Sequence, residues 1–205
     1  MRKLAIIGAS EHGKVVADIA LMRGYMDIVF LDDNPAVSQC AGFPIVGSFS
    51  IAGKLGTGFD YIVAIGNPTA RERIQENIDG KLVSLIHPNV TIGRRVEIGE
   101  GTVVMAGAVV NSDTVIGKGA IVNTCALVDH DCRIANYVHV SVGAHVAGNV
   151  NVCERTWLGI GSCVSNNVSI CRDCMVGAGA VVVQDIDVSG TYVGIPAKIL
   201  HVNEN

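Results

Sequence analysis

Hydrophobic positions recur every six residues along the second part of the chain, starting at Ile86. Seventeen consecutive hexads begin with an aliphatic residue, sixteen of them Val or Ile, and the fifth position is always small or β-branched. Because six is no multiple of the helical period of about 3.6 residues, this pattern excludes a long helix. It predicts short strands joined by tight turns and stacked as a β-solenoid, with the Gly, Asn and Asp residues that follow the first position at the corners.

The first 85 residues follow a different pattern, in which buried strands alternate with helices. We expect strands over residues 4–8, 28–31 and 61–66 and helices over 12–22 and 68–77. This alternation predicts a small parallel sheet, whose ligands bind at the carboxyl ends of its strands. Three segments fall there: the loop Gly8–Gly13, the pair Asp32–Asp33, and Gly66–Asn67. The expected domains are residues 1–85, residues 86–190 and a C-terminal cap or tail over 191–205.

Composition narrows the possible partners. The net charge of −4 is spread evenly over the 205 residues, with no basic stripe, so we expect no nucleic acid partner. The first apolar run is too short for a signal peptide, and no stretch approaches the ~20 apolar residues of a membrane span. We therefore expect a soluble, cytoplasmic protein whose seven cysteines are mostly reduced.

The loop Gly8–Gly13 is ambiguous alone. It lacks the second glycine of a dinucleotide fingerprint and the Lys-Ser/Thr of a P-loop, so a simple strand-to-helix turn explains it as well as ligand binding does. The order of motifs is more specific: G-A-S-x-H-G, F-L-D-D, A-I-G-N and L-I-H-P precede the hexads. Over essentially the whole chain this order resembles the hexapeptide-repeat nucleotide-sugar acetyltransferases, which include bacillosamine-pathway and perosamine N-acetyltransferases and sialic acid O-acetyltransferases.

The resemblance implies an α/β N-terminal Rossmann-like subdomain followed by a left-handed parallel β-helix with three hexads per coil. It also implies acetyl-CoA as co-substrate, a nucleotide-sugar substrate, and a homotrimer with acetyl-CoA between neighbouring helices. The positions that match the family's nucleotide-sugar site are Ser10, Glu11, His12, Asp32, Asp33 and Gly66. Glu11 replaces the usual glycine, and an acid beside a diphosphate is unfavourable, so we expect Glu11 to point away.

His130 is the candidate catalytic residue. It is third in its hexad, outside the inward-facing register, and its neighbours Asp129 and Asp131 favour the charged imidazolium. By resemblance His130 is the general base, Asp131 orients its ring, the Gly148 amide binds the oxyanion, and Asn123 holds the acceptor amine. If residues 18 apart stack on adjacent coils, Gly148 lies next to His130 and leaves room for a ligand.

By the same resemblance, His139, Ile160, Gly177 and Ala178 contact acetyl-CoA. Trp157 follows His139 by 18 residues, so a packed aromatic–imidazole pair explains that position too. We expect no metal: Cys171 and Cys174 form a lone C-x-x-C, and a small-residue ladder with Cys153 is favoured over zinc or a disulfide.

The favoured function is N-acetylation of the 4-amino group of a UDP-linked 4-amino-4,6-dideoxy sugar for glycan assembly. Three alternatives stay open: a sugar O-acetyltransferase, a non-catalytic nucleotide-sugar-binding module, and a zinc enzyme like the γ-class carbonic anhydrases. The last needs three histidines on one metal, but His130, His139 and His145 are spaced 9 and 6 apart and fall on different faces.

Overall fold

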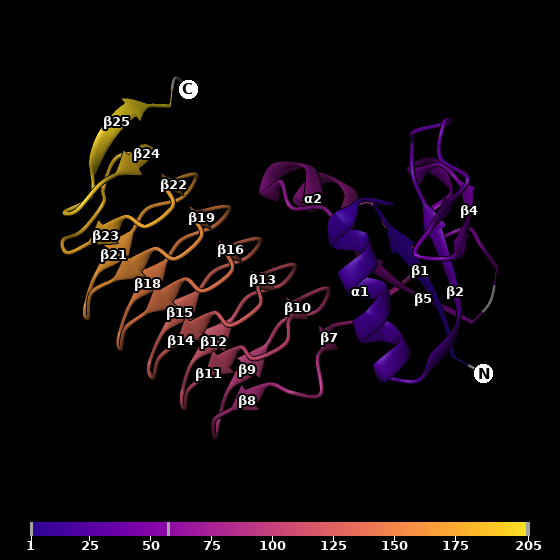
Figure 1. Cartoon of the computed structure of the whole chain (residues 1–205), viewed down its shortest axis with the longest axis horizontal. Coiled ribbons are helices and arrows are strands. Elements are labelled where there is room, and N and C mark those ends of the chain that lie inside the picture. Colours follow the sequence, from indigo (N-terminus) through magenta and orange to yellow (C-terminus); the bar gives the residue numbers. More distant parts are fainter. Residues whose placement is uncertain (1, 57, 204–205) are drawn as a thin grey trace.

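The N-terminal region is a mixed sheet flanked by two helices (Figure 1). The structure, a computed structural model, describes residues 2–56 and 58–203. The sheet order is β3-β4-β2-β1-β5-β6, with β1 parallel to both β2 and β5. The elements are β1 (Arg2–Ile7), α1 (Glu11–Met22), β2 (Tyr25–Leu31), β3 (Gln39–Cys40), β4 (Phe43–Gly47), a 3-10 helix (Phe49–Ile51), β5 (Phe59–Val63), α2 (Pro68–Gln75) and β6 (Lys81–Leu82). The three strands and two helices expected from the sequence are confirmed, with ends shifted by a few residues.

The hexads form a three-sided parallel β-helix, seen from the side in Figure 1. Within the described part of the chain the β-helix consists of seventeen two-residue strands, β7 to β23, each paired with the strand three positions earlier or later. Face 1 comprises β7 (Leu85–Ile86), β10 (Val103–Val104), β13 (Ile121–Val122), β16 (His139–Val140), β19 (Trp157–Leu158) and β22 (Met175–Val176). Face 2 comprises β8 (Thr91–Ile92), β11 (Val109–Val110), β14 (Leu127–Val128), β17 (His145–Val146), β20 (Cys163–Val164) and β23 (Val181–Val182). Face 3 comprises β9 (Glu97–Ile98), β12 (Val115–Ile116), β15 (Arg133–Ile134), β18 (Asn151–Val152) and β21 (Ser169–Ile170).

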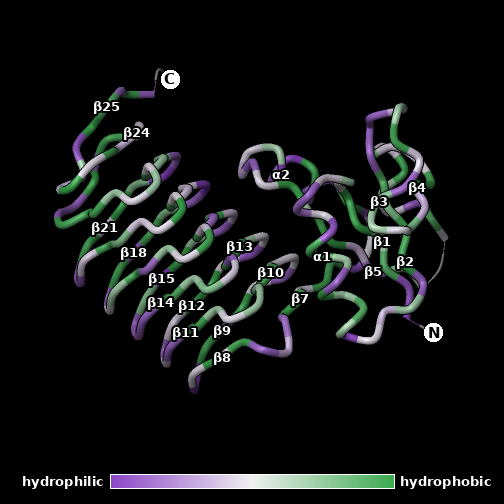
Figure 2. Tube along the Cα trace, viewed as in Figure 1, coloured by the Kyte–Doolittle hydropathy of each residue, from purple (hydrophilic) through white to green (hydrophobic). Residues whose placement is uncertain are grey.

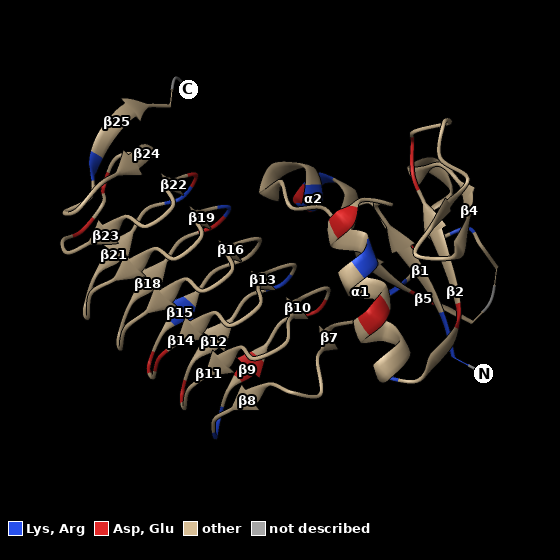
Figure 3. Ribbon diagram, viewed as in Figure 1, with Lys and Arg blue, Asp and Glu red and all other residues tan. Residues whose placement is uncertain are grey.

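The core of the β-helix is built from the first and fifth positions of the hexads. From Val104 to Val182 the first position is at most 3% exposed, and the fifth positions from Thr102 to Ile186 are at most 4% exposed. In Figure 2 the coil strands are mostly green and the hydrophilic residues gather near the corners. Figure 3 shows charges of both signs scattered over the coils. The six-residue period therefore marks the side chains that point into the core of the β-helix, as expected.

The corners begin at the second hexad position, as expected, but their left-handed residue comes two positions later. In the fifteen hexads from the one starting at Ile92 to the one starting at Val176, the residue with left-handed backbone is the fourth, as at Asp113, Asp131 and Asp173, where φ is 65°, 59° and 58°. Glycines at the second position serve another purpose: a Cβ on Gly93 would lie 2.5 Å from the Ser112 nitrogen of the next coil. The second position therefore lies at the corner, as expected, but its glycines are selected by close approach between coils rather than by left-handed backbone.

The last coil is followed by a two-stranded extension. β24 (Gly190–Val193) pairs in parallel with β22, and β25 (Lys198–Val202) turns back antiparallel to β24. This extension lies at the far end of the β-helix from the N-terminal sheet (Figure 1). It covers one edge of the last coil, where the hexad pattern stops.

The two regions share a hydrophobic core. Leu85, Val103 and Ile121, which face outward from face 1, pack in one buried cluster with residues of β1, α1 and β2. Helix α2 lies along the corner between faces 3 and 1. There the fully buried guanidinium of Arg71 donates to the carbonyls of Gly119 (2.6 Å) and Tyr137 (2.7 Å) in the β-helix. The first coils are thus fixed to the N-terminal sheet by apolar packing and by α2.

Candidate functional site

His130 lies at the corner between faces 2 and 3, in the turn from β14 to β15. Its Nδ1 is 2.8 Å from Asp131 Oδ2, and both side chains are more than half exposed, at 56% and 59%. The hydrogen bond to Asp131, followed by the charge of Asp129, raises the pKa of His130 above its ordinary value. Because a carboxylate only accepts, Nδ1 carries the hydrogen in the neutral ring, and Nε2 holds the free lone pair.

Asp129 stabilises the same turn through two hydrogen bonds to its carboxylate. Its carboxylate accepts from Asn111 Nδ2 at 2.7 Å and from the His130 backbone N–H at 2.8 Å. The hydrogen bond from Asn111 is the largest cause of a lowered pKa at Asp129. Asp129 is therefore ionised at neutral pH and holds the backbone of His130, whereas Asp131 holds its ring.

Gly148 lies against the imidazole, as the stacking of coils predicts. A Cβ built on Gly148 would be 2.7 Å from both Cε1 and Nε2 of His130, so no side chain fits without moving the ring. Among residues 2–56 and 58–203, no protein acceptor is assigned to the Gly148 N–H. The absence of a side chain at Gly148 thus leaves space beside Nε2 of His130.

A second group of predicted residues lies on face 1 and at the corner between faces 1 and 2. His139 is 6% exposed and stacks on Trp157, with ring centroids 4.6 Å apart. Its Nε2 is 3.1 Å from Asn123 Nδ2, and burial, followed by the charge of Arg71, lowers its pKa to about 3. His139 is therefore neutral and holds the Asn123 amide. Ile160, which is exposed, and Gly177 and Ala178 follow β19 and β22 at the same corner.

The third group surrounds the carboxyl ends of β1, β2 and β5. Asp32 accepts from the backbone N–H of Ala9 at 2.7 Å and of Asn34 at 2.9 Å, so it lies against the Gly8–Gly13 loop. Asp33 accepts from the N–H of Phe49 at 2.8 Å. The carboxyl ends of these strands meet at one edge, as the parallel sheet predicts.

Residues 10–12 lead from this loop into α1. Ser10 is the N-cap residue, and Glu11 is exposed in the first turn, where the helix dipole favours an acid. His12 is largely buried, and this burial, followed by the charge of Arg71, lowers its pKa to about 4. Gly66 lies across the junction from Trp157, with its Cβ position 3.8 Å from the indole.

A single chain does not bring all three groups together. The N-terminal region packs on face 1, whereas His130 is at the corner between the other two faces. Asn123 precedes β14 and His130 follows it, so they occupy different corners of one coil. His130, His139 and His145 are likewise on separate strands or corners, and the described residues contain no group of three or more metal-ligating side chains.

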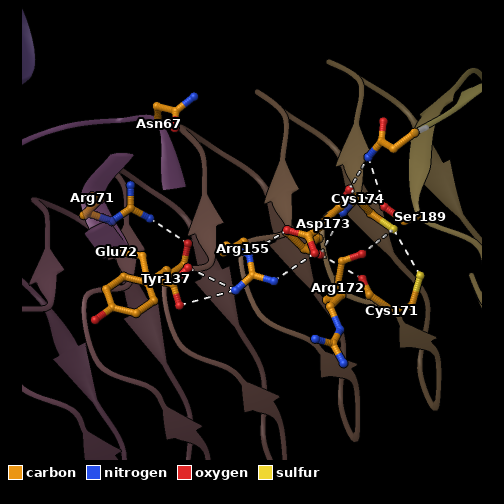
Figure 4. Close-up of polar contacts among 12 residues, drawn as sticks. Asn67, Arg71, Glu72, Tyr137, Arg155, Cys171, Arg172, Asp173, Cys174 and Ser189 are labelled. Atoms are coloured by element: carbon orange, nitrogen blue, oxygen red, sulfur yellow. Dashed lines mark hydrogen bonds and ion pairs between the residues drawn. The ribbon is translucent and has the colours of Figure 1, made fainter. Parts of the chain in front are cut away.

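Sequence reasoning missed the residues that join the two regions (Figure 4). Arg71 Nη1 also donates to the carbonyls of Ile65 and Gly66, each at 2.8 Å, which fixes the loop that carries Gly66. Arg155 pairs with Glu72 of α2 at 3.0 Å and with Asp173 of the next coil at 2.6 Å. A cavity of about 270 Å³ opens beside them, lined by Asn67, Thr69, Arg155, Trp157 and Met175 among others. In the sequence, Arg71 stands out only as one of two arginines, with Arg73, in a short polar helix. That pattern alone does not indicate which arginine is buried or what it contacts.

Comparisons with known proteins agree with this architecture. The family described as the PglD N-terminal domain matches residues 3–78. The acetyltransferase domain of PglB from Neisseria gonorrhoeae is 44% identical over 98% of this chain and 100% of that chain, with a TM-score of 0.93. Its complex with acetyl coenzyme A is similar at 45% identity, over 97% of this chain and 99% of that one, with a TM-score of 0.93. PerB from Caulobacter crescentus, solved with CoA and GDP-perosamine, is 38% identical over 98% of each chain, with a TM-score of 0.93.

A curated relative is also similar. UDP-N-acetylbacillosamine N-acetyltransferase from Bacillus subtilis is 33% identical over 113 residues, which are 52% of this chain and 52% of that protein. The match thus spans about half the length of that relative. The solved structures cover the whole architecture, and the predicted fold, an α/β region followed by a left-handed parallel β-helix, is confirmed. None of the helices in the described residues is long and apolar enough to span a membrane.

Proposed function

Because this chain belongs to the hexapeptide-repeat family of nucleotide-sugar N-acetyltransferases, we propose that it transfers the acetyl group of acetyl-CoA to the 4-amino group of a UDP-linked 4-amino-4,6-dideoxy sugar. The observation that carries the proposal is the full-length match, at 45% identity, to an acetyltransferase domain solved with acetyl coenzyme A. The curated relative is named for a UDP-linked amino sugar, which favours UDP over the GDP of PerB. We further propose that the enzyme acts in the cytoplasm and supplies glycan assembly.

In the proposed mechanism His130 is the general base. The amine nitrogen attacks the thioester carbonyl carbon, and the new N–C bond leaves a negative charge on the carbonyl oxygen. Nε2 of His130 takes the proton from that nitrogen while Asp131 stabilises the resulting imidazolium, a role worth about 10²–10⁴-fold in rate. The tetrahedral intermediate then collapses, the C–S bond breaks, and the proton from His130 goes to the departing CoA sulfur.

Gly148 is proposed as the oxyanion donor. Its residue position is beside Nε2, so an acetyl carbonyl within reach of the base is also close to the Gly148 backbone. A fixed backbone N–H needs no reorganisation when the oxygen becomes charged, and one such donor is worth about 10²–10³-fold. The absence of a side chain at Gly148 keeps this space open.

The nucleotide is proposed to lie along the edge formed by β1, β2 and β5, against Ser10, Glu11, His12, Asp32, Asp33 and Gly66. Two of these already have structural partners: Asp32 holds the Ala9 N–H and Asp33 holds the Phe49 N–H. Their remaining oxygen lone pairs are available for nucleoside donors. Glu11 is exposed in the first turn of α1, which is consistent with a carboxylate that avoids the diphosphate.

A homotrimer is proposed because the catalytic and cofactor residues are split within one chain. His130 and Gly148 are at the corner between faces 2 and 3, whereas Asn123, Ile160, Gly177 and Ala178 are at the corner between faces 1 and 2. A threefold axis parallel to the β-helix would bring the corner between faces 2 and 3 of one chain next to the corner between faces 1 and 2 of its neighbour. Acetyl-CoA then lies between two chains, and His139 contributes by holding Asn123.

Substrate choice tests the chemistry of the proposal. We would follow thiol release from acetyl-CoA with UDP- and GDP-linked 4-amino-4,6-dideoxyhexoses and with matched sugars that carry a 4-hydroxyl group. We expect the UDP-linked amine to react fastest and to gain one acetyl group by mass spectrometry. Acetylation of the hydroxyl sugar alone would contradict N-acetylation, and a preference for the GDP-linked amine would contradict the nucleotide assignment.

Subunit mixing tests the assembly. His130→Ala and Asn123→Ala chains, each nearly inactive alone, would be unfolded together, refolded at equal amounts and assayed. If each site takes His130 from one chain and Asn123 from its neighbour, half times half of the sites are intact, so about a quarter of wild-type activity returns. No gain on mixing, with trimers confirmed by light scattering, would place both residues in one chain's site.

A further inference from the structure

Two thiols meet at the last corner between faces 3 and 1. Cys171 and Cys174 flank the turn from β21 to β22, and their Sγ atoms are 3.4 Å apart. Both are free cysteines. They occupy the second and fifth hexad positions, which hold Gly99 and Thr102, Gly117 and Ala120, Ala135 and Val138, and Cys153 and Thr156 in the other coils of this corner. Among the described coils at this corner, only the one with Cys171 and Cys174 has a cysteine at both positions.

The turn geometry brings these side chains together. Asp173, between the cysteines, has a left-handed backbone with φ of 58°, and the chain turns there from face 3 to face 1. A disulfide requires about 2.05 Å between the sulfurs, so closure needs a movement of only about 1.4 Å.

The two thiols differ in access. Cys174 is 2% exposed, and its burial, followed by the hydrogen bond with Cys171, raises its pKa to about 12. Cys171 is only partly buried and is followed by Arg172, whose side chain is exposed. A small disulfide therefore reaches Cys171 first, and the exposed Arg172 adds a positive charge to the same turn.

The turn between the cysteines also holds several contacts (Figure 4). The Asp173 carboxylate accepts two hydrogen bonds from Arg155, at 2.6 and 2.9 Å, and Arg155 in turn pairs with Glu72 of α2. The Asp173 carbonyl accepts from Ser189 Oγ at 2.9 Å and from Asn203 Nδ2 at 2.7 Å. A bond across this turn therefore fixes a point where α2, the last coil and the C-terminal extension meet.

We propose that Cys171 and Cys174 form a thiol–disulfide exchange site, at which a small anionic disulfide oxidises the pair to a disulfide across the Asp173 turn. The Cys171 thiolate attacks one sulfur of R–S–S–R; a mixed disulfide forms, and R–S⁻ leaves and takes the proton that Cys171 released. Cys174, after losing its proton, attacks Cys171 Sγ; the Cys171–Cys174 bond forms, and the second R–S⁻ leaves and takes that proton. Two protein thiols lose two electrons in total, and one small disulfide becomes two thiols.

The experiment treats the folded full-length chain with glutathione disulfide in a Cys125→Ser background, which removes an exposed thiol. Non-reducing peptide mapping should show the segment containing residues 171–174 lighter by two hydrogens, and dithiothreitol should reverse this. Cys174→Ala should instead retain one glutathione on Cys171, and Cys171→Ala should leave Cys174 unmodified. Alanine is suited to both sites, because Ala135 and Ala120 occupy the same hexad positions at this corner.

The rate of closure gives a second readout. Since burial raises the pKa of Cys174, closure of the mixed disulfide should accelerate by about tenfold per pH unit between pH 7 and 9. A Cys153–Cys171 disulfide, a stable glutathione adduct on wild-type Cys171, or persistence of both thiols after treatment would each overturn the proposal. Circular dichroism of each alanine variant separates these outcomes from a failure to fold.

Discussion

Replacing Arg71 with Met tests the account of how the two regions are joined. The guanidinium donates four hydrogen bonds to carbonyls, two in the β-helix and two in the loop that carries Gly66. At about 1.5 kcal/mol for each bond from a charged donor, their sum is about 6 kcal/mol. Burial opposes this, because it lowers the pKa of Arg71 from 12.5 to about 10, a cost of about 3 kcal/mol for the charged form. The net expectation is a loss of about 3 kcal/mol in the free energy of unfolding.

Urea denaturation followed by circular dichroism measures this loss, and Arg73→Met is the matched control. Arg73 is on the same helix and is exposed, so its replacement should change the free energy of unfolding by no more than about 0.5 kcal/mol. An Arg71→Met loss below about 1 kcal/mol, or one equal to that of Arg73→Met, would refute the idea that this buried cation joins the regions. Arg71→Lys should fall between the two, because an ammonium group cannot reach carbonyls on both sides.

Gly148→Ala should lower kcat by up to about 10²–10⁴-fold with little change in KM for the nucleotide sugar, because its Cβ would lie 2.7 Å from the His130 ring and displace the proposed general base; steady-state kinetics decide this, and an unchanged kcat would contradict the assigned geometry. Stability should fall as the pH drops from 6.5 towards 4, because the pKa of His12 is about 4 and that of His139 about 3, so the unfolded chain binds more protons in this range. Each histidine contributes up to about 1.4 kcal/mol per pH unit, and urea unfolding of His12→Gln should show a shallower slope than the wild type; an equal slope would mean that His12 is not buried and neutral. Arg155→Met should cost about 1 kcal/mol, and a double-mutant cycle with Glu72→Gln that shows no coupling would argue against their ion pair.

The sequence predicted the β-helix well because its signal is local and repeated. Each hexad places one aliphatic and one small residue inward, and seventeen repetitions leave little freedom in register. The stacking of Gly148 on His130 follows from the same arithmetic, and the structure places them in contact. Which hexad position takes the left-handed backbone could not be read from composition, because glycine is selected both by left-handed φ and by close packing of coils.

The junction between the regions could not be predicted, since it depends on contacts between distant segments. Arg71 contacts carbonyls 48 and 66 residues away, and carbonyls leave no trace in the sequence. The pairing of Tyr137 with Glu76 is similar: neither residue belongs to a motif. His139 shows the opposite case, because its resemblance to a cofactor residue was visible in the sequence, whereas its burial against Trp157 and its bond to Asn123 required the structure.

Acetyl transfer by wild-type and His130→Ala chains, compared side by side, tests the central claim most directly. Thiol release from acetyl-CoA would be measured with a UDP-linked 4-amino-4,6-dideoxyhexose, and binding of the sugar nucleotide would be measured for both chains by calorimetry. The account predicts an acetylated product from the wild type, a kcat lower by about 10²–10⁴-fold in the variant, and nearly equal binding. Near-normal turnover by His130→Ala, or no thiol release by the wild type with any amino sugar nucleotide, would contradict it.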